Sequence, residues 1–318
     1  MDPNASIGWV SLTVSDLEEA LSFYTGILGM DKISNTENGC VVLGAARTPL
    51  IILREQRGAT PKPPNTRGLY HYAILLPNRR NLADMFTRLY NMWKLDGGAD
   101  HLVSEALYLR DPDGHGVEIY TDKPRGMWRR SRSGEISMAT LPLNLDNLLK
   151  ELQREEIGKN LNSRWRLPTG TRIGHIHLHV SNLKKAEEFY HKILGLDITT
   201  RSYLGALFMS AGGYHHHIGV NVWAGEDAPP TPSESVQLVS FAIKLTDRDN
   251  LNKITKRLEE KRIKFNEGLI NKITGYRGVS VKDFDGNNVE LISWKMIKIY
   301  SESLWIYLEK LGLWLSLR

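Results

Sequence analysis

Residues 7–30 read IGWVSLTVSDLEEALSFYTGILGM, and residues 173–196 read IGHIHLHVSNLKKAEEFYHKILGL. Both stretches fit the skeleton IGxxxLxVSxLxxAxxFYxxILGx. The alternating apolar residues at the start of each stretch predict a half-buried strand. A helix follows the strand, and in the first copy a capping box at Ser15–Glu18 should open it. Self-similarity on this scale indicates that the chain contains an internal duplication.

Two shorter repeats divide each half of the chain again. HYAILLPNRRNLADMFTRL at 71–89 matches SFAIKLTDRDNLNKITKRL at 240–258, and DPDGHGVEIY at 111–120 matches DFDGNNVELI at 283–292. We therefore predict an α+β fold built from four β-α-β-β-β modules, at 7–55, 68–122, 173–224 and 236–293. Proline-rich segments at 61–64 and 229–232 separate the modules within each half.

The repeats also predict how the chain is divided. We expect an N-terminal domain at 1–122 and a C-terminal domain at 171–293, joined by a linker at 123–170. The linker should contain a helix at 145–156, and its arginines are interpreted as a solvated surface. The tail at 294–318 has apolar residues at helical spacing, which predicts an amphipathic helix that packs against the body or a neighbouring subunit.

Composition limits the class of protein. The 318 residues carry a formal net charge of +5, with 41% hydrophobic and 24% charged residues, as in an ordinary globular protein. No basic stripe or recognition motif indicates nucleic-acid binding. We see neither a signal peptide nor an apolar run long enough for a membrane span. The single cysteine, Cys40, suits a reducing compartment, so we expect a cytoplasmic protein.

Histidines gather in the third module. Seven of the ten in the chain lie there: His175, His177, His179, His191, His215, His216 and His217. Strand alternation predicts that His175, His177 and His179 share one face of their strand. In the later strand, His215 and His217 should share one face, and His216 should point to the opposite face. The triple histidine could be an engineered tag, a surface strand, or a metal or proton-relay site, and a tag would be expected at a terminus.

Aligning the modules shows which residues occupy equivalent places. The position of His175 is taken by Trp9, His71 and Ser240 in modules one, two and four. In the last strand, modules two and four each carry an acid. Modules two and three together therefore supply two histidines and one carboxylate, whereas modules three and four lack the second histidine at Ser240.

These features resemble the vicinal oxygen chelate superfamily. Four β-α-β-β-β units, the opening GHIHLHVSNLKKAEEFY and the DPDGxxVE ending carry the resemblance over residues 7–293. Within the superfamily the chain resembles two-domain catechol 2,3-dioxygenases, so two tandem domains with half-barrel mixed sheets are expected. The resemblance implies Fe(II), with Mn(II) or another divalent ion as the alternative, held by two histidines and one carboxylate. It also implies a small aromatic diol and O2 as substrates.

The resemblance assigns roles to particular residues. The favoured metal ligands are His71, His175 and Glu118, and the alternative set is His175, His215 and Glu290. Proton transfer to and from the bound diol is assigned to His217, with His216 and Tyr276 as further candidates for catalysis. Substrate contacts are assigned to His177, His179, Tyr214 and Asn221. His101, His115 and His191 are interpreted as incidental.

Two other classes of function stay open at this point. One is a glyoxalase-like isomerase or metal-dependent thiol transferase, and such enzymes commonly place a second carboxylate on the metal. The other is a non-catalytic small-molecule-binding member, which would not need a histidine-rich centre. One fold hosts many activities, so the site has to decide. The sequence is compatible with a homo-oligomer.

Overall fold

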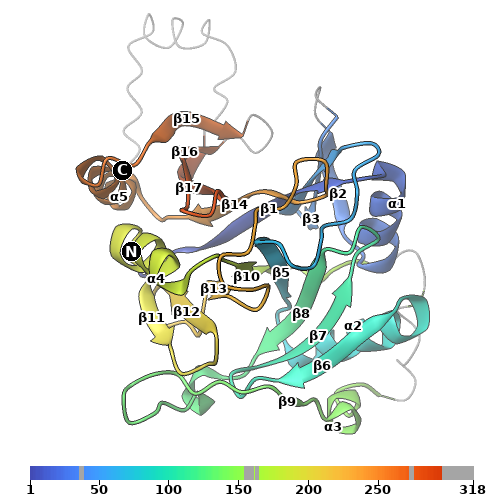
Figure 1. The fold of residues 1–318 in the computed structure, drawn as a ribbon. Helices are drawn as coiled ribbons and strands as arrows, with labels where there is room; N and C mark the ends of the chain where they lie inside the picture. Colours follow the sequence, from blue (N-terminus) through green and yellow to red (C-terminus); the bar gives the residue numbers. More distant parts are fainter. Residues whose placement is uncertain (36–38, 154–160, 162–164, 272–275, 296–318) are drawn as a thin grey trace, which may run out of the picture.

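A computed structural model describes the chain except residues 36–38, 154–160, 162–164, 272–275 and 296–318. Each of the four modules has the predicted order of one strand, one helix and three strands. The class is α+β, with two mixed sheets and few helices (Figure 1). The predicted tail helix lies outside the described residues, apart from 294 and 295, which end the last strand.

Modules one and four form an eight-stranded sheet with the order β15-β16-β17-β14-β1-β4-β3-β2. Module one contributes β1 (Ser6–Val14), β2 (Asp31–Asn35), β3 (Val41–Ala45) and β4 (Thr48–Glu55). Module four contributes β14 (Leu238–Lys244), β15 (Phe265–Asn271), β16 (Tyr276–Lys282) and β17 (Asn288–Lys295). The first strands of the two modules, β1 and β14, pair antiparallel and join the halves of this sheet.

Modules two and three form a nine-stranded sheet with the order β11-β12-β13-β10-β5-β8-β7-β6-β9. Module two contributes β5 (Gly68–Leu75), β6 (Leu95–Asp100), β7 (Ser104–Arg110) and β8 (Gly116–Asp122). Module three contributes β10 (Arg172–His179), β11 (Asp197–Thr200), β12 (Ala206–Ser210) and β13 (Ile218–Asn221), and the linker adds β9 (Leu141–Pro142). Each sheet thus joins one module from each half of the sequence, and the division into domains at 1–122 and 171–293 stays a prediction.

The bounds of the helices follow from the local sequence. They are α1 (Leu17–Leu21), α2 (Arg79–Met92), α3 (Leu145–Leu149), α4 (Leu183–Glu187) and α5 (Arg248–Glu260), with π-helical turns at Ser22–Ile27 and Glu188–Ile193. The predicted capping box is wrong by one position. Asp16 caps α1 by accepting from the Glu19 N–H at 3.0 Å, while Ser15 binds Asp113 of the second module. A cap one residue later therefore frees Ser15 for a contact between modules.

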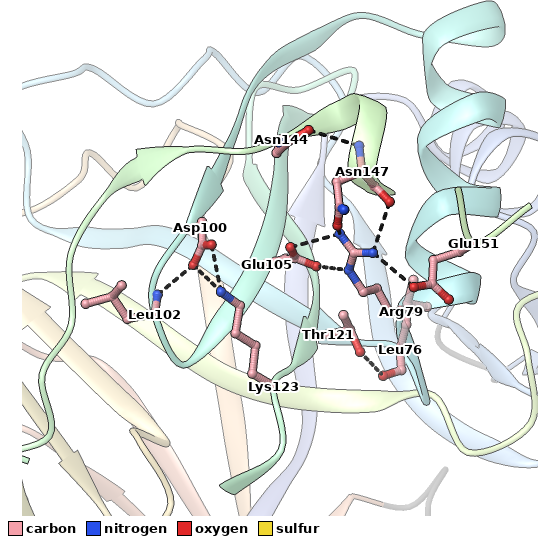
Figure 2. A network of polar contacts seen from close by, with 10 residues as sticks. All are labelled: Leu76, Arg79, Asp100, Leu102, Glu105, Thr121, Lys123, Asn144, Asn147 and Glu151. Carbon is pink, nitrogen blue, oxygen red and sulfur yellow. Dashed lines mark hydrogen bonds and ion pairs between the residues drawn. The ribbon is translucent and has the colours of Figure 1, made fainter. Parts of the chain in front are cut away.

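One arginine binds the linker to module two, in addition to the pairing of β9 with β6. Arg79, at the start of α2, donates to Glu105 of β7 at 2.6 Å and to Glu151 beyond α3 at 2.9 Å (Figure 2). It also donates to the side chain of Asn147 at 2.9 Å. Helix α3 spans five residues of the predicted 145–156, and 154–156 lie outside the described residues. The linker thus packs against the nine-stranded sheet, as Figure 1 also shows.

Candidate metal centre and cavity

Three adjacent central strands bring together the residues predicted to bind metal. In the nine-stranded sheet, β5 lies between β10 and β8. Ala73 on β5 pairs in register with both His175 on β10 and Glu118 on β8. His71 precedes Ala73 by two residues and so shares its face of the strand. Strand pairing alone therefore places two imidazoles and one carboxylate on one face, around the small side chain of Ala73.

The three side chains converge on a common point. Glu118 Oε2 lies 3.0 Å from His71 Nε2 and 3.1 Å from His175 Nε2. One ligand atom from each residue lies within 4.8 Å of the other two, and all three residues are buried. Among the residues that the structure describes, this is the one group of three or more His, Cys, Asp or Glu side chains with such geometry. The favoured ligand set is thus brought together.

The residues present fit a divalent cation. His71 Nε2 is buried and makes no hydrogen bond, although it lies so close to the Glu118 carboxylate. A buried polar atom without a partner is costly, and a cation at the meeting point would accept its lone pair. Two imidazoles and one carboxylate are a donor set for non-haem iron(II). The orphaned nitrogen therefore supports a metal site on the structure's own evidence.

Burial and mutual contact set the charges of this group. Burial by itself would raise the pKa of Glu118, but contact with His175 and His71 outweighs it and holds that pKa well below 4.5. Burial lowers the pKa of His175 to about 4, against the attraction of Glu118. At neutral pH the acid is therefore ionised and His175 is neutral, which are the forms that bind a metal.

A cavity of about 290 Å³ opens beside the three residues. It is lined mostly by aromatic and apolar side chains. The residues are Tyr70, His71, His101, Val103, Ser104, Tyr108, Glu118, Met138, Thr140, His175, His177, Tyr203, Phe208, His216 and Trp223. Volume and lining suit one small aromatic ring with a few polar groups to orient it.

His101, interpreted from the sequence as incidental, lies on the wall of this cavity. Its Nδ1 donates to the Ala139 carbonyl at 2.7 Å, which leaves Nε2 to accept from the Tyr108 hydroxyl at 2.6 Å. The Tyr108 hydroxyl, which also interacts with the Glu118 carboxylate, thereby lies on the cavity wall. Sequence reasoning missed this pair because His101 lies between strands and its ring is held by the linker.

Of the four predicted substrate contacts, only His177 lines the cavity. Asn221 is fully buried and bridges two histidines, with its amide 2.9 Å from His177 Nε2 and its carbonyl 2.6 Å from His179 Nδ1. His179 faces a separate hollow beside Lys62. Tyr214 lies against Asp122, with its hydroxyl 3.0 Å from the carboxylate. The last three therefore support the cavity from outside it.

The triple histidine does not behave as a regular strand, because β13 begins only at Ile218. His216 lines the cavity with its ring 4.1 Å from that of His175. His217 lines another hollow, next to Arg172, and its Nδ1 accepts from the Ala211 N–H at 3.2 Å. His217, the residue predicted to transfer protons, therefore lies away from this cavity, whereas His216, the further candidate, lines it. Burial lowers the pKa of His216 well below 6.5, so its ring is neutral.

The alternative metal set is not brought together. Glu290 lies in the other sheet, where it accepts from Trp9 Nε1–H at 2.9 Å and from the Ser240 hydroxyl at 2.8 Å. His215 contacts Asp122 instead, at 3.0 Å. Tyr276 also lies in the other sheet, with its ring 5.5 Å from that of Trp9, and does not line the cavity.

Comparison with known proteins agrees with this geometry. Residues 6–119 and 172–291 match the family described as the Glyoxalase/Bleomycin resistance protein/Dioxygenase superfamily. The chain belongs to this superfamily.

Within its described residues, no helix combines the length and the apolar character needed to cross a bilayer.

Members of the superfamily resemble the chain to different degrees. The catechol-2,3-dioxygenase of Bacillus subtilis (strain 168) is 42% identical over 256 residues, which cover 80% of this chain and 87% of that protein. A crystal structure of a candidate dioxygenase from the same organism superposes with a TM-score of 0.59 at 12% identity and covers 98% of both chains. Glyoxalase I from Zea mays gives a TM-score of 0.53 at 16% identity, covering 91% of this chain and 92% of that one. The two structures show a shared fold only.

Proposed function

We propose that the protein is a metal-dependent extradiol dioxygenase that opens the ring of an uncharged catechol with O2, and that its metal is iron(II), with Mn(II) as the alternative. The observation that carries this proposal is the convergence of His71, His175 and Glu118 on the wall of an aromatic cavity. Identity of 42% to a catechol-2,3-dioxygenase supports the reaction. The predicted cytoplasmic location and homo-oligomeric state stay predictions.

His71, His175 and Glu118 would hold the ion, which would supply Lewis-acid and redox chemistry for the reaction of the diol with O2. The protein holds the three ligands on central strands, where neighbouring strands fix their orientation. The ring bond beside the diol breaks, and both atoms of O2 enter the ring-opened product. No other oxidant or reductant is needed.

Side chains around the cavity would bind the diol and move its protons. The rings of Phe208 and Trp223 offer apolar surfaces to an aromatic ring and exclude water. The Tyr108 hydroxyl, on the cavity wall, can form a hydrogen bond with a substrate hydroxyl. His216 is neutral and can take up the proton that the diol releases on binding.

The lining of the cavity indicates which catechols would bind. Among the described residues, no lysine or arginine lines it. A carboxylate on the substrate ring would therefore lose its hydration without gaining a cationic partner, which is costly. We infer that the ring substituents are uncharged.

Anaerobic loading with iron(II), followed by catechol and O2, tests the proposal. We expect oxygen uptake together with the conjugated ring-opened product in equal amounts. Isomerisation of a glutathione hemithioacetal without oxygen uptake would instead identify a glyoxalase-like isomerase. Catechol binding without turnover in the iron-loaded protein would identify a small-molecule-binding member.

A further inference from the structure

A chain of hydrogen bonds leads from the cavity to a carboxylate outside it. His216 lines the cavity, and its Nδ1 lies 2.8 Å from Nδ1 of the neighbouring His215. On its other side, His215 places Nε2 3.0 Å from Oδ1 of Asp122. The His215 ring is fully buried, whereas about a quarter of the Asp122 side chain is exposed. The acid comes from the end of β8 and the histidines from the turn before β13, so tertiary structure makes this contact.

The direction of each hydrogen bond follows from what the groups can donate. A carboxylate only accepts, so the hydrogen between His215 and Asp122 must lie on His215 Nε2. In a neutral imidazole the other nitrogen then carries a lone pair, so His215 Nδ1 accepts. With a neutral His215 ring, the hydrogen in the bond between the two rings belongs to His216 Nδ1. This leaves Nε2 of His216 with an unshared pair.

Two tyrosines hold Asp122 in place. The Tyr214 hydroxyl donates to the same oxygen of Asp122 that His215 contacts, at 3.0 Å. The Tyr120 hydroxyl lies 2.7 Å from that of Tyr214 and continues the network into the sheet. Because two donors converge on one oxygen, its position is fixed independently of the carboxylate's charge.

We propose that Asp122 is a positioning residue that acts through His215 to hold His216 in the tautomer with its hydrogen on Nδ1 and a lone pair on Nε2. That tautomer can accept a proton from a bound diol at once, whereas the other would first have to give up its own hydrogen. The consequence for turnover rests on the proposed dioxygenase function. The tautomer itself does not, because it follows from contacts within this chain.

Nitrogen NMR of the metal-free protein with 15N-labelled histidine tests the tautomer directly. Signals are assigned by their loss in His215→Asn and His216→Asn. We expect the hydrogen on Nδ1 of His216 and on Nε2 of His215 in the unmodified protein. A hydrogen on Nε2 of His216, or a doubly protonated His215, overturns the proposal, and this measurement needs no variant of Asp122 that folds.

Two substitutions of Asp122 separate hydrogen-bond direction from simple packing. Asp122→Asn keeps an oxygen that Tyr214 holds in place, so the His216 tautomer should be retained. Asp122→Ala removes the acceptor, and both tautomers of His216 should appear. Glu226→Gln removes one negative charge from an exposed residue and is the matched control that should leave the signals unchanged. An Ala variant with the tautomer of the unmodified protein overturns the proposal.

Turnover of the iron-loaded protein gives the second measurement. We expect kcat to fall by about 10²-fold or more in Asp122→Ala, with KM little changed, because a misplaced hydrogen disables an acid–base group without removing a substrate contact. Asp122→Asn should keep most of the activity. Equal losses in the two variants overturn the positioning role. If the unmodified protein shows the expected tautomer but no ring cleavage, the proposed function fails and the inference about Asp122 stands.

Discussion

Three buried histidines should make the metal-free protein sensitive to mild acid. His175, His177 and His216 are each at most 8% exposed. Burial is the largest cause that lowers their pKa values, to about 4 for His175 and well below 6.5 for the other two. In the unfolded chain the same side chains titrate near 6.5. The unfolded state therefore binds protons that the folded state does not, and acid favours unfolding.

The size of the effect follows from linkage. The contribution of these histidines is fully present above pH 6.5 and is lost as the pH falls from 6.5 toward their folded pKa values. Between pH 7.5 and 5.5 each neutral, buried histidine should cost about 1.4 kcal/mol of unfolding free energy. Three of them give about 4 kcal/mol, which is a large part of the roughly 5–15 kcal/mol that stabilises an ordinary domain. His179 and His217, whose pKa values burial lowers to about 4 and about 3, add to this difference.

Urea unfolding of the metal-free protein at the two pH values measures this difference. His216→Gln should reduce the difference by about 1.4 kcal/mol, whatever the variant does to the absolute stability, because one titrating ring is gone. A divalent metal added at pH 7.5 should raise the unfolding midpoint, since it binds only the folded state. Equal unfolding free energies at both pH values, or a difference that His216→Gln leaves intact, would refute the reasoning.

Three further outcomes are expected. Glu118→Ala should weaken iron(II) binding by more than about tenfold, whereas the matched variant Glu290→Ala should keep the metal content of the unmodified protein. Glu290→Ala should instead lower the unfolding free energy by about 1–3 kcal/mol, because it leaves Trp9 Nε1–H unpaired. Catechol should have a kcat/KM at least about tenfold higher than a carboxylated catechol, because a buried carboxylate would lack a cation; equal values would contradict the uncharged-substituent inference. Arg79→Gln should lower the unfolding free energy by about 2 kcal/mol through loss of charged hydrogen bonds to Glu105 and the linker, measured by urea denaturation.

The repeats made most of the fold predictable. A strand-helix opening and a DPDG-type turn each recur with their spacing, so the module order and the class followed from the sequence. The ligands His71, His175 and Glu118 could be found for the same reason, because aligned modules place the two histidines at equivalent positions of their first strands and Glu118 at the acidic position of a last strand. The pairing of modules two and three was selected by chemistry, since that pair supplied both histidines and an acid, and the sheet order agrees.

What failed depended on contacts that no local pattern records. The faces of the triple histidine were predicted from strand alternation, yet the strand begins after His217, so His216 rather than His217 meets the cavity. His101 gained its place from the carbonyl of Ala139 in the linker. Asp122 was not considered at all, because its partner His215 is 93 residues away in the sequence.

The two sheets show how one position in a repeated fold can take two different roles. Glu118 and Glu290 occupy equivalent places in the last strand of their modules. Glu118 faces two imidazoles, one of them without a hydrogen-bond partner, and its pKa is held well below 4.5. Glu290 has both oxygens satisfied by neutral donors, and burial raises its pKa against the hydrogen bonds from Ser240 and Trp9. An ionised, buried acid beside an imidazole nitrogen without a hydrogen-bond partner suits a cation, whereas an acid already bonded to an indole and a hydroxyl does not. Replacement of two histidines by Trp9 and Ser240 is therefore sufficient to explain why the second sheet keeps the carboxylate and lacks the other donors of a metal centre.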